Sequence, residues 1–242
     1  LGYRFFDTAQ IYGNASAIGR GVLLSDLPRA EIFISSKIWT SHRSYDGVMR
    51  AFTDIIEQLK TTYLDQLLIH WPATQGEPMI WQSQNAGTWR ALEDLYEQGA
   101  VKVIGVSNFL PHHLVPLLAR ARIRPMVNQL EIHPGYPQFA AVNFCFKQNI
   151  AVQAWSPLGR GGLTHHPLLI ELGEKYGVSP ALIALRWSLQ HGFIPVVKAL
   201  DAEHMKSNLD AFGLTLEDED MTRLDTMQQV AFSGLHPDTV TF

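Results

Sequence analysis

The sequence predicts an α/β fold in which parallel strands alternate with helices, arranged as a closed (β/α)8 barrel. Two observations predict this class: apolar runs of strand length recur along the chain, and stretches of helical periodicity lie between them. A third observation concerns the runs themselves, most of which lack the apolar–polar alternation of a half-exposed sheet. Such runs are typical of parallel strands that are covered on both faces.

The strand-length runs cover residues 3–6, 31–36, 65–69, 101–106, 126–132, 150–155 and 193–198. Between them, the stretch 45–61 carries its apolar side chains on one helical stripe. The stretch 86–99 ends at a glycine suited to a helix C-terminus, and 179–192 begins with Ser followed by Pro, a good helix start. Strand–helix–strand units of about thirty residues indicate right-handed crossovers and a parallel sheet.

Two layouts fit this order, a closed barrel and an open doubly wound sheet. An open sheet with a dinucleotide site would carry G-x-G-x-x-G directly after its first strand, and the motif is absent there; the nearest glycine cluster is GRGG at 159–162. The barrel is therefore favoured, but it needs eight strands and only seven are read. Because the chain starts on Leu1 inside an apparent element, we expect the first strand to lie before residue 1.

Composition narrows the class of protein. The chain has 242 residues, is 46% hydrophobic and carries a formal charge of −4, which argues against nucleic acid or a polybasic membrane surface. No Gly/Ser-rich linker interrupts it, so we expect one domain over 1–242. Cys145 is the only cysteine, which excludes an internal disulfide and favours a reducing, cytoplasmic location. No apolar stretch is long enough to cross a bilayer.

Polar side chains stand at or just beyond the end of each run. In chain order they are Asp7, Lys37, His70, Ser107 with Asn108, Asn128 with Gln129 and His133, Trp155 with Ser156, and Lys198. Each alone has an ordinary explanation as a turn former or a solvated side chain. In a parallel barrel, however, all strand ends lie on one face, where active sites of this fold are found. An acid, a base and an imidazole at the ends of consecutive strands therefore predict an active site on this face of the barrel.

The chemistry that these groups suggest is acid catalysis by a phenol. A phenol titrates near ~10, and an adjacent ammonium lowers that value toward a useful range. Lys37 is suited to act on Tyr12 in this way, with Asp7 holding the lysine by an ion pair and His70 orienting a carbonyl oxygen. A proton delivered to a carbonyl is half of a reduction, and the hydride must come from a cofactor.

The motifs GYRFFDTAQIYGN, SSKIW, LLIHWP, VIGVSNF, NQLEIHP and AWSPLG resemble those of the aldo-keto reductase family, in order and spacing, from residue 2 to about 238. The resemblance implies a (β/α)8 barrel that reduces a small carbonyl substrate with NADPH. The family's Asp, Tyr, Lys and His tetrad maps onto Asp7, Tyr12, Lys37 and His70. It also implies a monomer.

The same resemblance implies the cofactor contacts. Ser107, Asn108 and Gln129 would bind the nicotinamide carboxamide, and Trp155 would stack on the ring; Trp here is similar to the bacterial diketogluconate-reductase branch. Ser156, Leu158 and Arg160 would lie along the pyrophosphate. Near the adenosine, Lys198 and Asn208 match the family, whereas His204 replaces an arginine that would face the 2′-phosphate. We therefore expect weakened discrimination, with NADPH still preferred through Lys198 and NADH possible.

The resemblance places Trp39 and Trp71 in the walls of the substrate pocket, although core packing explains Trp71 about equally well. Pocket width depends on loops such as 72–86. No metal is expected: the pairs His112–His113 and His165–His166 are interpreted as solvated, without an acidic partner at ligand spacing, and EDED at 217–220 as a solvated helix start. Two alternatives stay open, a catalytically silent nucleotide-binding barrel that serves as a partner subunit, and an inactive truncated remnant.

Overall fold

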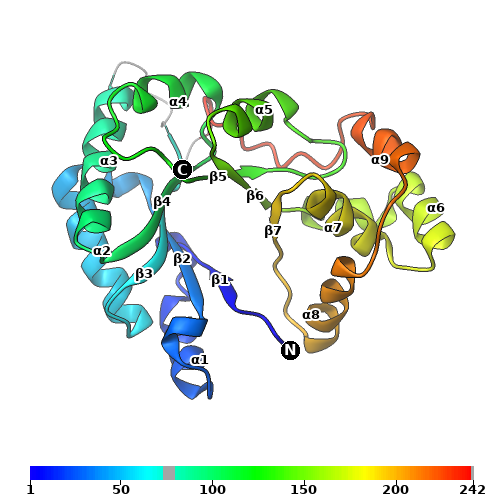
Figure 1. Cartoon of the computed structure of the whole chain (residues 1–242), viewed down its shortest axis with the longest axis horizontal. Coiled ribbons are helices and arrows are strands. Elements are labelled where there is room, and N and C mark those ends of the chain that lie inside the picture. Colours follow the sequence, from blue (N-terminus) through cyan, green and yellow to red (C-terminus); the bar gives the residue numbers. More distant parts are fainter. Residues whose placement is uncertain (73–79, 241–242) are drawn as a thin grey trace. The chain divides into compact units, whose positions relative to one another are not determined.

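The computed structural model describes residues 1–72 and 80–240. Those residues contain seven β-strands and nine α-helices, alternating along the chain much as the sequence predicts (Figure 1). Contacts concentrate in two compact units, one of Gly2–Asn128 with His236–Phe242 and one of Gln129–Leu235 with Leu1. The single domain expected from composition stays a prediction.

The first unit is built on four parallel strands, each hydrogen-bonded to the next along the chain. They are β1 (Phe5–Asp7), β2 (Phe33–Ile38), β3 (Leu64–Ile69) and β4 (Val101–Ser107). The register sets Asp7 opposite Ser35, Ile38 opposite Ile69, and Ile69 opposite Val106. The carboxyl ends of all four strands therefore lie along one edge of the sheet.

Helices flank these strands. They are α1 (Ala15–Leu24), α2 (Tyr45–Leu59), α3 (Trp81–Glu97) and α4 (Pro111–Leu118), each in contact with the next; in Figure 1, α2 and α3 run beside the strands. Helix α2 is an example of how the local sequence sets these elements. Ser44 Oγ accepts the Gly47 N–H at the helix start, the apolar stripe is buried, and the helix ends at Leu59, before Lys60 in left-handed backbone. The buried faces of these helices form the core beneath the strand ends.

The second unit holds the parallel pair β6 (Ala151–Trp155) and β7 (Ile194–Val196), while β5 (Val127–Glu131) contributes residues to both units. Its helices are α5 (Phe139–Lys147), α6 (Pro167–Tyr176), α7 (Pro180–Gln190), α8 (Ala202–Asn208) and α9 (Asp218–Asp225). Cys145 is buried on α5, which packs on β6. Because the thiol is fully enclosed, nothing favours it as a nucleophile.

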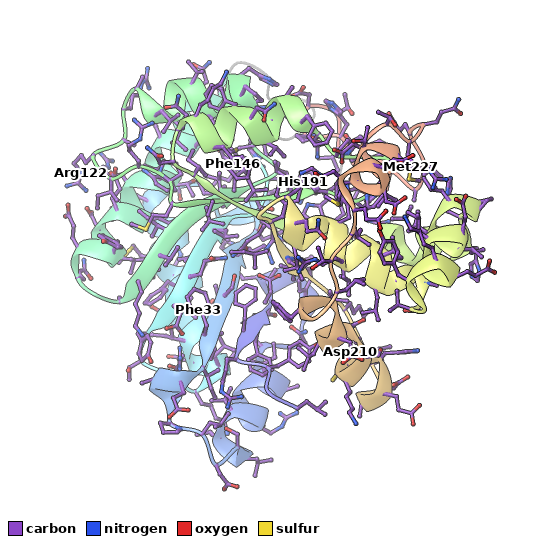
Figure 2. The ribbon with its side chains drawn as sticks, turned by 45° about the vertical axis from the view of Figure 1, so that its right-hand side comes forward. Phe33, Arg122, Phe146, His191, Asp210 and Met227 are labelled. Carbon is purple, nitrogen blue, oxygen red and sulfur yellow. The ribbon has the colours of Figure 1, made fainter. Side chains whose placement is uncertain are left out.

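A polar cluster joins α7 to the end of α9 in this second unit. Trp187 Nε1 donates a hydrogen bond of 2.7 Å to Asp225 Oδ1, and His191 Nε2 lies 2.8 Å from the same oxygen. The His191 ring, labelled in Figure 2, also stacks on Phe193 with ring centres 5.3 Å apart. One carboxylate thus anchors two large rings at the end of α7.

Some element boundaries differ from those read in the sequence. Strands β1 and β2 both start two residues later than the runs 3–6 and 31–36, and they end one and two residues later, so Asp7 and Lys37 lie inside β1 and β2 rather than after them. The helix expected over 86–99 begins at Trp81, and residues 73–79 of the loop 72–86 lie outside the described residues. Apolar runs report burial, whereas a strand continues as long as its neighbour supplies hydrogen bonds.

The interpretation of 217–220 as solvated is wrong for one residue. Asp220, in the first turn of α9, is buried and accepts hydrogen bonds from Lys175 Nζ at 2.7 Å and Tyr176 Oη at 2.6 Å. Burial alone would raise the pKa of Asp220, but these two hydrogen bonds outweigh it and hold the pKa below its usual value. The acid therefore joins α9 to α6, which a local pattern does not reveal. No helix within the described residues combines the length and apolar character that a bilayer span needs.

Candidate active site

A buried ion pair lies at the carboxyl ends of β1 and β2. Lys37 Nζ contacts Asp7 Oδ2 at 2.5 Å and donates a second hydrogen bond to the Thr8 carbonyl at 3.0 Å. The Lys37 side chain is completely buried and that of Asp7 is 7% exposed. Because an unpaired ammonium is very costly inside a protein, the counter-charge of Asp7 offsets the cost of burying Lys37.

Tyr12 and His70 lie next to this pair. Lys37 Nζ is 5.3 Å from the centre of the Tyr12 ring, and the His70 ring meets the Tyr12 ring edge-on at 5.9 Å between centres. Tyr12 is carried by the 3₁₀ turn η1 (Gln10–Tyr12) after β1, and His70 directly follows β3. The structure thus brings together all four residues of the expected tetrad, and Tyr12 is 50% exposed to solvent.

The environment of His70 sets its charge. Burial, together with the positive charge of Lys37, holds the pKa of His70 well below 6.5. The imidazole is therefore neutral at neutral pH. Within the described residues no protein group hydrogen-bonds its Nδ1 atom. A neutral ring can orient or hydrogen-bond a carbonyl oxygen, but it carries no surplus proton to give away.

Two tryptophans surround His70. The Trp39 ring meets the imidazole edge-on at 5.1 Å, and the Trp71 ring stacks against it at 6.3 Å between centres. Trp39 is half-buried, whereas Trp71 is only 4% exposed. Trp39 is thus available to a substrate at the strand ends, and Trp71 contributes mainly by packing behind the imidazole.

Ser107 and Asn108 continue this line of strand ends at β4. Asn108 adopts left-handed backbone with φ +63°, and its side-chain Nδ2 donates to the His70 carbonyl at 3.0 Å and to Ser107 Oγ at 3.1 Å. Both residues are buried. Asparagine tolerates this backbone better than most residues, which accounts for its place in the turn. The two residues are brought beside His70, within the first unit.

The remaining predicted cofactor residues lie in the second unit. Gln129 Nε2 donates to Gln153 Oε1 at 2.9 Å, so neighbouring strands present a pair of buried amides. Trp155 is the last residue of β6 and is half-buried. Ser156 follows it with φ +50°, so the chain turns sharply as it leaves the strand.

In the loop beyond Ser156, one predicted cofactor residue packs into the core and the other is exposed to solvent. Leu158 packs against an apolar cluster formed by Leu182, Leu185 and Ala211, while Arg160 is exposed with φ +54°. A cofactor would meet Leu158 through its backbone rather than its side chain. Arg160 extends toward solvent.

The last three predicted cofactor residues lie near α8: Lys198 precedes the helix, and His204 and Asn208 are part of it. Lys198 is exposed in the loop after β7, and Asn208 is half-buried at the C-terminus of α8. His204 Nδ1 lies 3.0 Å from Asp201 Oδ2, and Asp201 Oδ1 also accepts the His204 N–H at the helix start. That backbone hydrogen bond is the main cause that lowers the pKa of Asp201. The histidine is therefore paired with an acid, which the sequence reading did not recognise.

Sequence reasoning also missed the residues that support the ion pair. Ser35 Oγ donates to Asp7 Oδ1 at 2.8 Å, and Gln66 Nε2 donates to Ser35 Oγ at 2.9 Å. Ser35 and Lys37 are two positions apart on β2 and share a face, and Gln66 is in register with Ser35 on β3. Polar residues at alternate positions of a buried strand were the signal that could have found them.

The interpretation of the pair His112–His113 as solvated is wrong for His113, and the pair does have an acidic partner. His113 is buried, and both Nε2 atoms reach Asp238 Oδ1, at 2.9 Å from His112 and 2.8 Å from His113. The acidic partner comes from the C-terminal segment, too far along the chain to appear in a local motif. The three ligand atoms lie within 4.8 Å of one another.

Hydrogen bonding at His113 disfavours a metal at this cluster. The Leu110 N–H donates to His113 Nδ1 at 3.1 Å, so the proton of the neutral ring lies on Nε2 and is donated to Asp238. A metal-bound imidazole needs the opposite arrangement, with a lone pair at the metal and an N–H on the other nitrogen. The absence of a bound metal stays a prediction, supported by this tautomer.

The same arrangement predicts acid sensitivity. Burial first, and then the charge of His112, lowers the pKa of His113 from 6.5 to about 4. Protonation of Nδ1 would also break the hydrogen bond from the Leu110 N–H. Because the unfolded chain binds this proton more readily than the folded one, acid lowers the free energy of unfolding. The effect of His113 is absent above about pH 6.5 and grows as pH falls toward 4, at up to ~1.4 kcal/mol per pH unit. Urea unfolding of His113→Gln, which keeps an acceptor but cannot titrate, should show a shallower loss than wild type. Equal slopes would contradict this assignment.

Several known proteins are similar to this chain along most of its length. Residues 1–229 match the model of the Aldo/keto reductase family. Among curated proteins, "Glyoxal reductase" of Bacillus subtilis is 41% identical over 241 residues, which cover 100% of this chain and 84% of that protein. A "9,11-endoperoxide prostaglandin H2 reductase" of Trypanosoma cruzi is 39% identical, covering 98% of this chain and 82% of that one.

Solved structures agree with the family match. An aldo-keto reductase from a Medee basin deep-sea metagenome library, MGS-M4, has a TM-score of 0.93 at 34% identity, covering 100% of this chain and 87% of its own. A point mutant of Gox0644 in complex with NADPH has a TM-score of 0.91 at 36% identity, covering 100% and 86%. These structures confirm the expected fold class, the (β/α)8 barrel.

Proposed function

Because this chain belongs to the aldo/keto reductase family and is an NAD(P)H-dependent reductase, we propose that it reduces an aldehyde or ketone to an alcohol with NADPH, and that Tyr12 donates the proton. The observation that carries the proposal is the buried Asp7–Lys37 pair beside a half-exposed phenol and a neutral imidazole. Burying a charged pair is costly to stability, which favours a functional role for Lys37 over a purely structural one. The catalytically silent alternative receives no support from such a site.

The residues present suit a nicotinamide dinucleotide. Ser107, Asn108 and Gln129 are buried hydroxyl and amide groups, which is the donor and acceptor chemistry that a carboxamide needs. The left-handed backbone at 159–161, where a Cβ added to Gly161 would meet nothing within 4 Å, leaves room for a phosphate beside main-chain groups. When bound, the nicotinamide supplies the hydride, which no side chain can provide.

The side chains of this chain would perform the remaining chemistry. His70, neutral because of its lowered pKa, would hydrogen-bond and orient the carbonyl oxygen. Tyr12 would transfer its phenolic proton to that oxygen as the carbonyl carbon is reduced, which yields the alcohol and a phenolate. The Lys37 ammonium, held by its ion pair with Asp7, would stabilise this phenolate. Trp39 and the exposed Tyr12 face would limit where a substrate can lie.

The direct test is NADPH oxidation by the purified chain, followed by the loss of absorbance of the reduced nicotinamide, with an aromatic aldehyde and with glyoxal. Glyoxal is included because one relative is named for it. We expect turnover of at least one substrate and binding of NADPH in a fluorescence titration. Binding without turnover across a broad carbonyl panel would instead favour the silent nucleotide-binding alternative.

Cofactor preference should be weak. His204 presents an imidazole that is already paired with Asp201, so it offers a 2′-phosphate less than the planar guanidinium of an arginine would, while the Lys198 amine lies nearby in sequence. We expect His204→Arg to tighten NADPH binding about tenfold, ~1.4 kcal/mol, and to leave NADH binding unchanged. Dissociation constants for both cofactors measure this. Tighter NADH than NADPH binding by wild type would refute the role of Lys198.

We further expect a monomer without nucleic-acid or membrane partners, working in the cytoplasm with a small carbonyl substrate. Sedimentation equilibrium of the purified chain tests the oligomeric state. A concentration-independent mass near 27.2 kDa is the expected result.

A further inference from the structure

The loop that carries Tyr12 is closed at its two ends by one hydrogen bond. Thr8 Oγ1 donates to Asn14 Oδ1 at 2.5 Å, and Tyr12 lies between them on η1. Thr8 is completely buried and is itself held from β2, through its N–H to the Ser35 carbonyl at 2.9 Å and its carbonyl to Lys37 Nζ at 3.0 Å. The hydroxyl of Thr8 therefore fastens the far end of the loop to the strand that bears Lys37.

Asn14 occupies a helix N-cap position, where an asparagine side chain ordinarily accepts an N–H of the first helical turn. It is the N-cap residue of α1, and its carbonyl accepts the N–H groups of Ala17 and Ile18, yet its side chain caps no N–H. At the starts of α2, α7 and α8, by contrast, the N-cap side chain accepts a first-turn N–H. Asparagine is among the best N-caps, worth about 1 kcal/mol. That interaction is given up in α1 for the bond to Thr8.

A second attachment comes from within the loop. Gln10 Oε1 accepts the Trp39 N–H at 3.0 Å, which joins the loop to the chain just after Lys37. Inside the loop, the Tyr12 N–H donates to the Ala9 carbonyl at 3.0 Å and the Gly13 N–H to the Gln10 carbonyl at 3.4 Å. Because half of Tyr12 is exposed, the backbone of this loop, rather than enclosure of the ring, determines where the phenol lies.

We infer that Thr8 and Asn14 are positioning residues, whose hydrogen bond holds the Tyr12 phenol in reach of Lys37 and His70. The inference rests on the proposed function and adds to it two residues that do not touch the reacting atoms. A proton donor displaced by about 1 Å loses roughly a hundredfold in rate. Loosening the loop without unfolding it should therefore lower kcat and leave cofactor binding unchanged.

The test compares Thr8→Val, which removes the hydroxyl at similar volume, with Thr8→Ser, which keeps it. Asn14→Ala and Asn14→Asp form the matching pair on the acceptor side. We expect kcat to fall at least tenfold in Thr8→Val and Asn14→Ala, with KM and the NADPH dissociation constant within about twofold. The deuterium isotope effect on kcat with 4-deuterated NADPH should rise, because chemistry then limits turnover. The double variant Thr8→Val/Asn14→Ala should fall no further than either single one.

Thr8→Ser and Asn14→Asp should recover most of the rate, since each restores the donor or the acceptor. Ser25→Ala serves as the stability control: it removes the 2.7 Å hydrogen bond from Ser25 Oγ to the Val22 carbonyl at the other end of α1. If Ser25→Ala lowers kcat as much as Thr8→Val at equal loss of Tm, the effect is general destabilisation and the inference is wrong.

Amide hydrogen exchange of the cofactor-free chain gives a readout that does not depend on activity. Exchange at Tyr12 and Gly13 should accelerate about tenfold in Thr8→Val and Asn14→Ala but not in the conservative variants. Unchanged exchange overturns the inference, and so does accelerated exchange without a fall in kcat. If wild type proves inactive on every carbonyl while exchange responds as expected, the proposed function fails and the role of the pair in holding Tyr12 stands.

Discussion

Tyr12→Phe is expected to lower kcat for carbonyl reduction by at least about a hundredfold, because it removes the one proton that the site can deliver to the substrate oxygen. His70 cannot replace it, since burial and the charge of Lys37 hold the pKa of His70 well below 6.5. Lys37 Nζ is already engaged by Asp7 and the Thr8 carbonyl. Steady-state oxidation of NADPH against an aromatic aldehyde measures the loss.

The fold and the cofactor site should not respond to this change. Half of the Tyr12 side chain is exposed, so losing its hydroxyl leaves no buried group unpaired, and Tm should shift by less than a few degrees. NADPH affinity should stay within about twofold. Tyr96→Phe removes a phenol oxygen from α3 and controls for loss of a hydroxyl elsewhere. Retention of a tenth or more of wild-type kcat in Tyr12→Phe would rule out its role as proton donor.

Asp7→Ala is expected to destabilise the fold by about 3–5 kcal/mol, since it leaves the ammonium of Lys37 buried without a counter-charge. The Lys37 side chain has no exposure to water, and the Thr8 carbonyl, which is uncharged, would remain as its acceptor. Ser35 Oγ also loses its acceptor on Asp7. Urea unfolding followed by far-ultraviolet circular dichroism measures the change.

Removing the lysine as well separates stability from catalysis. In Asp7→Ala/Lys37→Met no charge is buried, so the double variant should be more stable than Asp7→Ala, by at least about 1 kcal/mol. It should nevertheless be as inactive as either single variant, because the ammonium that stabilises the phenolate is gone. Stability losses that simply add in the double variant would contradict the view that the two side chains act as one buried pair.

Much of the site could be predicted from strand ends alone. In a parallel sheet all carboxyl ends lie on one edge, so Asp7, Lys37 and His70 at the ends of consecutive apolar runs are bound to approach one another. The structure agrees, with Lys37 on Asp7 and the His70 ring against Tyr12. The catalytic roles themselves stay predictions, because proximity does not establish chemistry.

Boundaries were harder to predict than elements. Lys37 lies inside β2 although it is charged, because its strand neighbours supply the backbone hydrogen bonds and Asp7 neutralises its side chain. Helix α3 begins earlier than its apolar stripe suggests. Both differences have one origin: a local pattern reports which face is buried, not how far a neighbouring strand or helix continues to support the backbone.

Periodicity and spacing, which are local properties, were thus sufficient for the fold class and the four expected catalytic side chains. Periodicity and spacing did not identify the partners of polar groups: Asp238 for His113, Asp220 for Tyr176 and Asn14 for Thr8 all depend on the three-dimensional arrangement. The reason is physical. An unpaired buried polar group takes whichever partner the folded chain brings within about 3 Å, and neither the distance along the chain nor the residue type specifies that partner in advance.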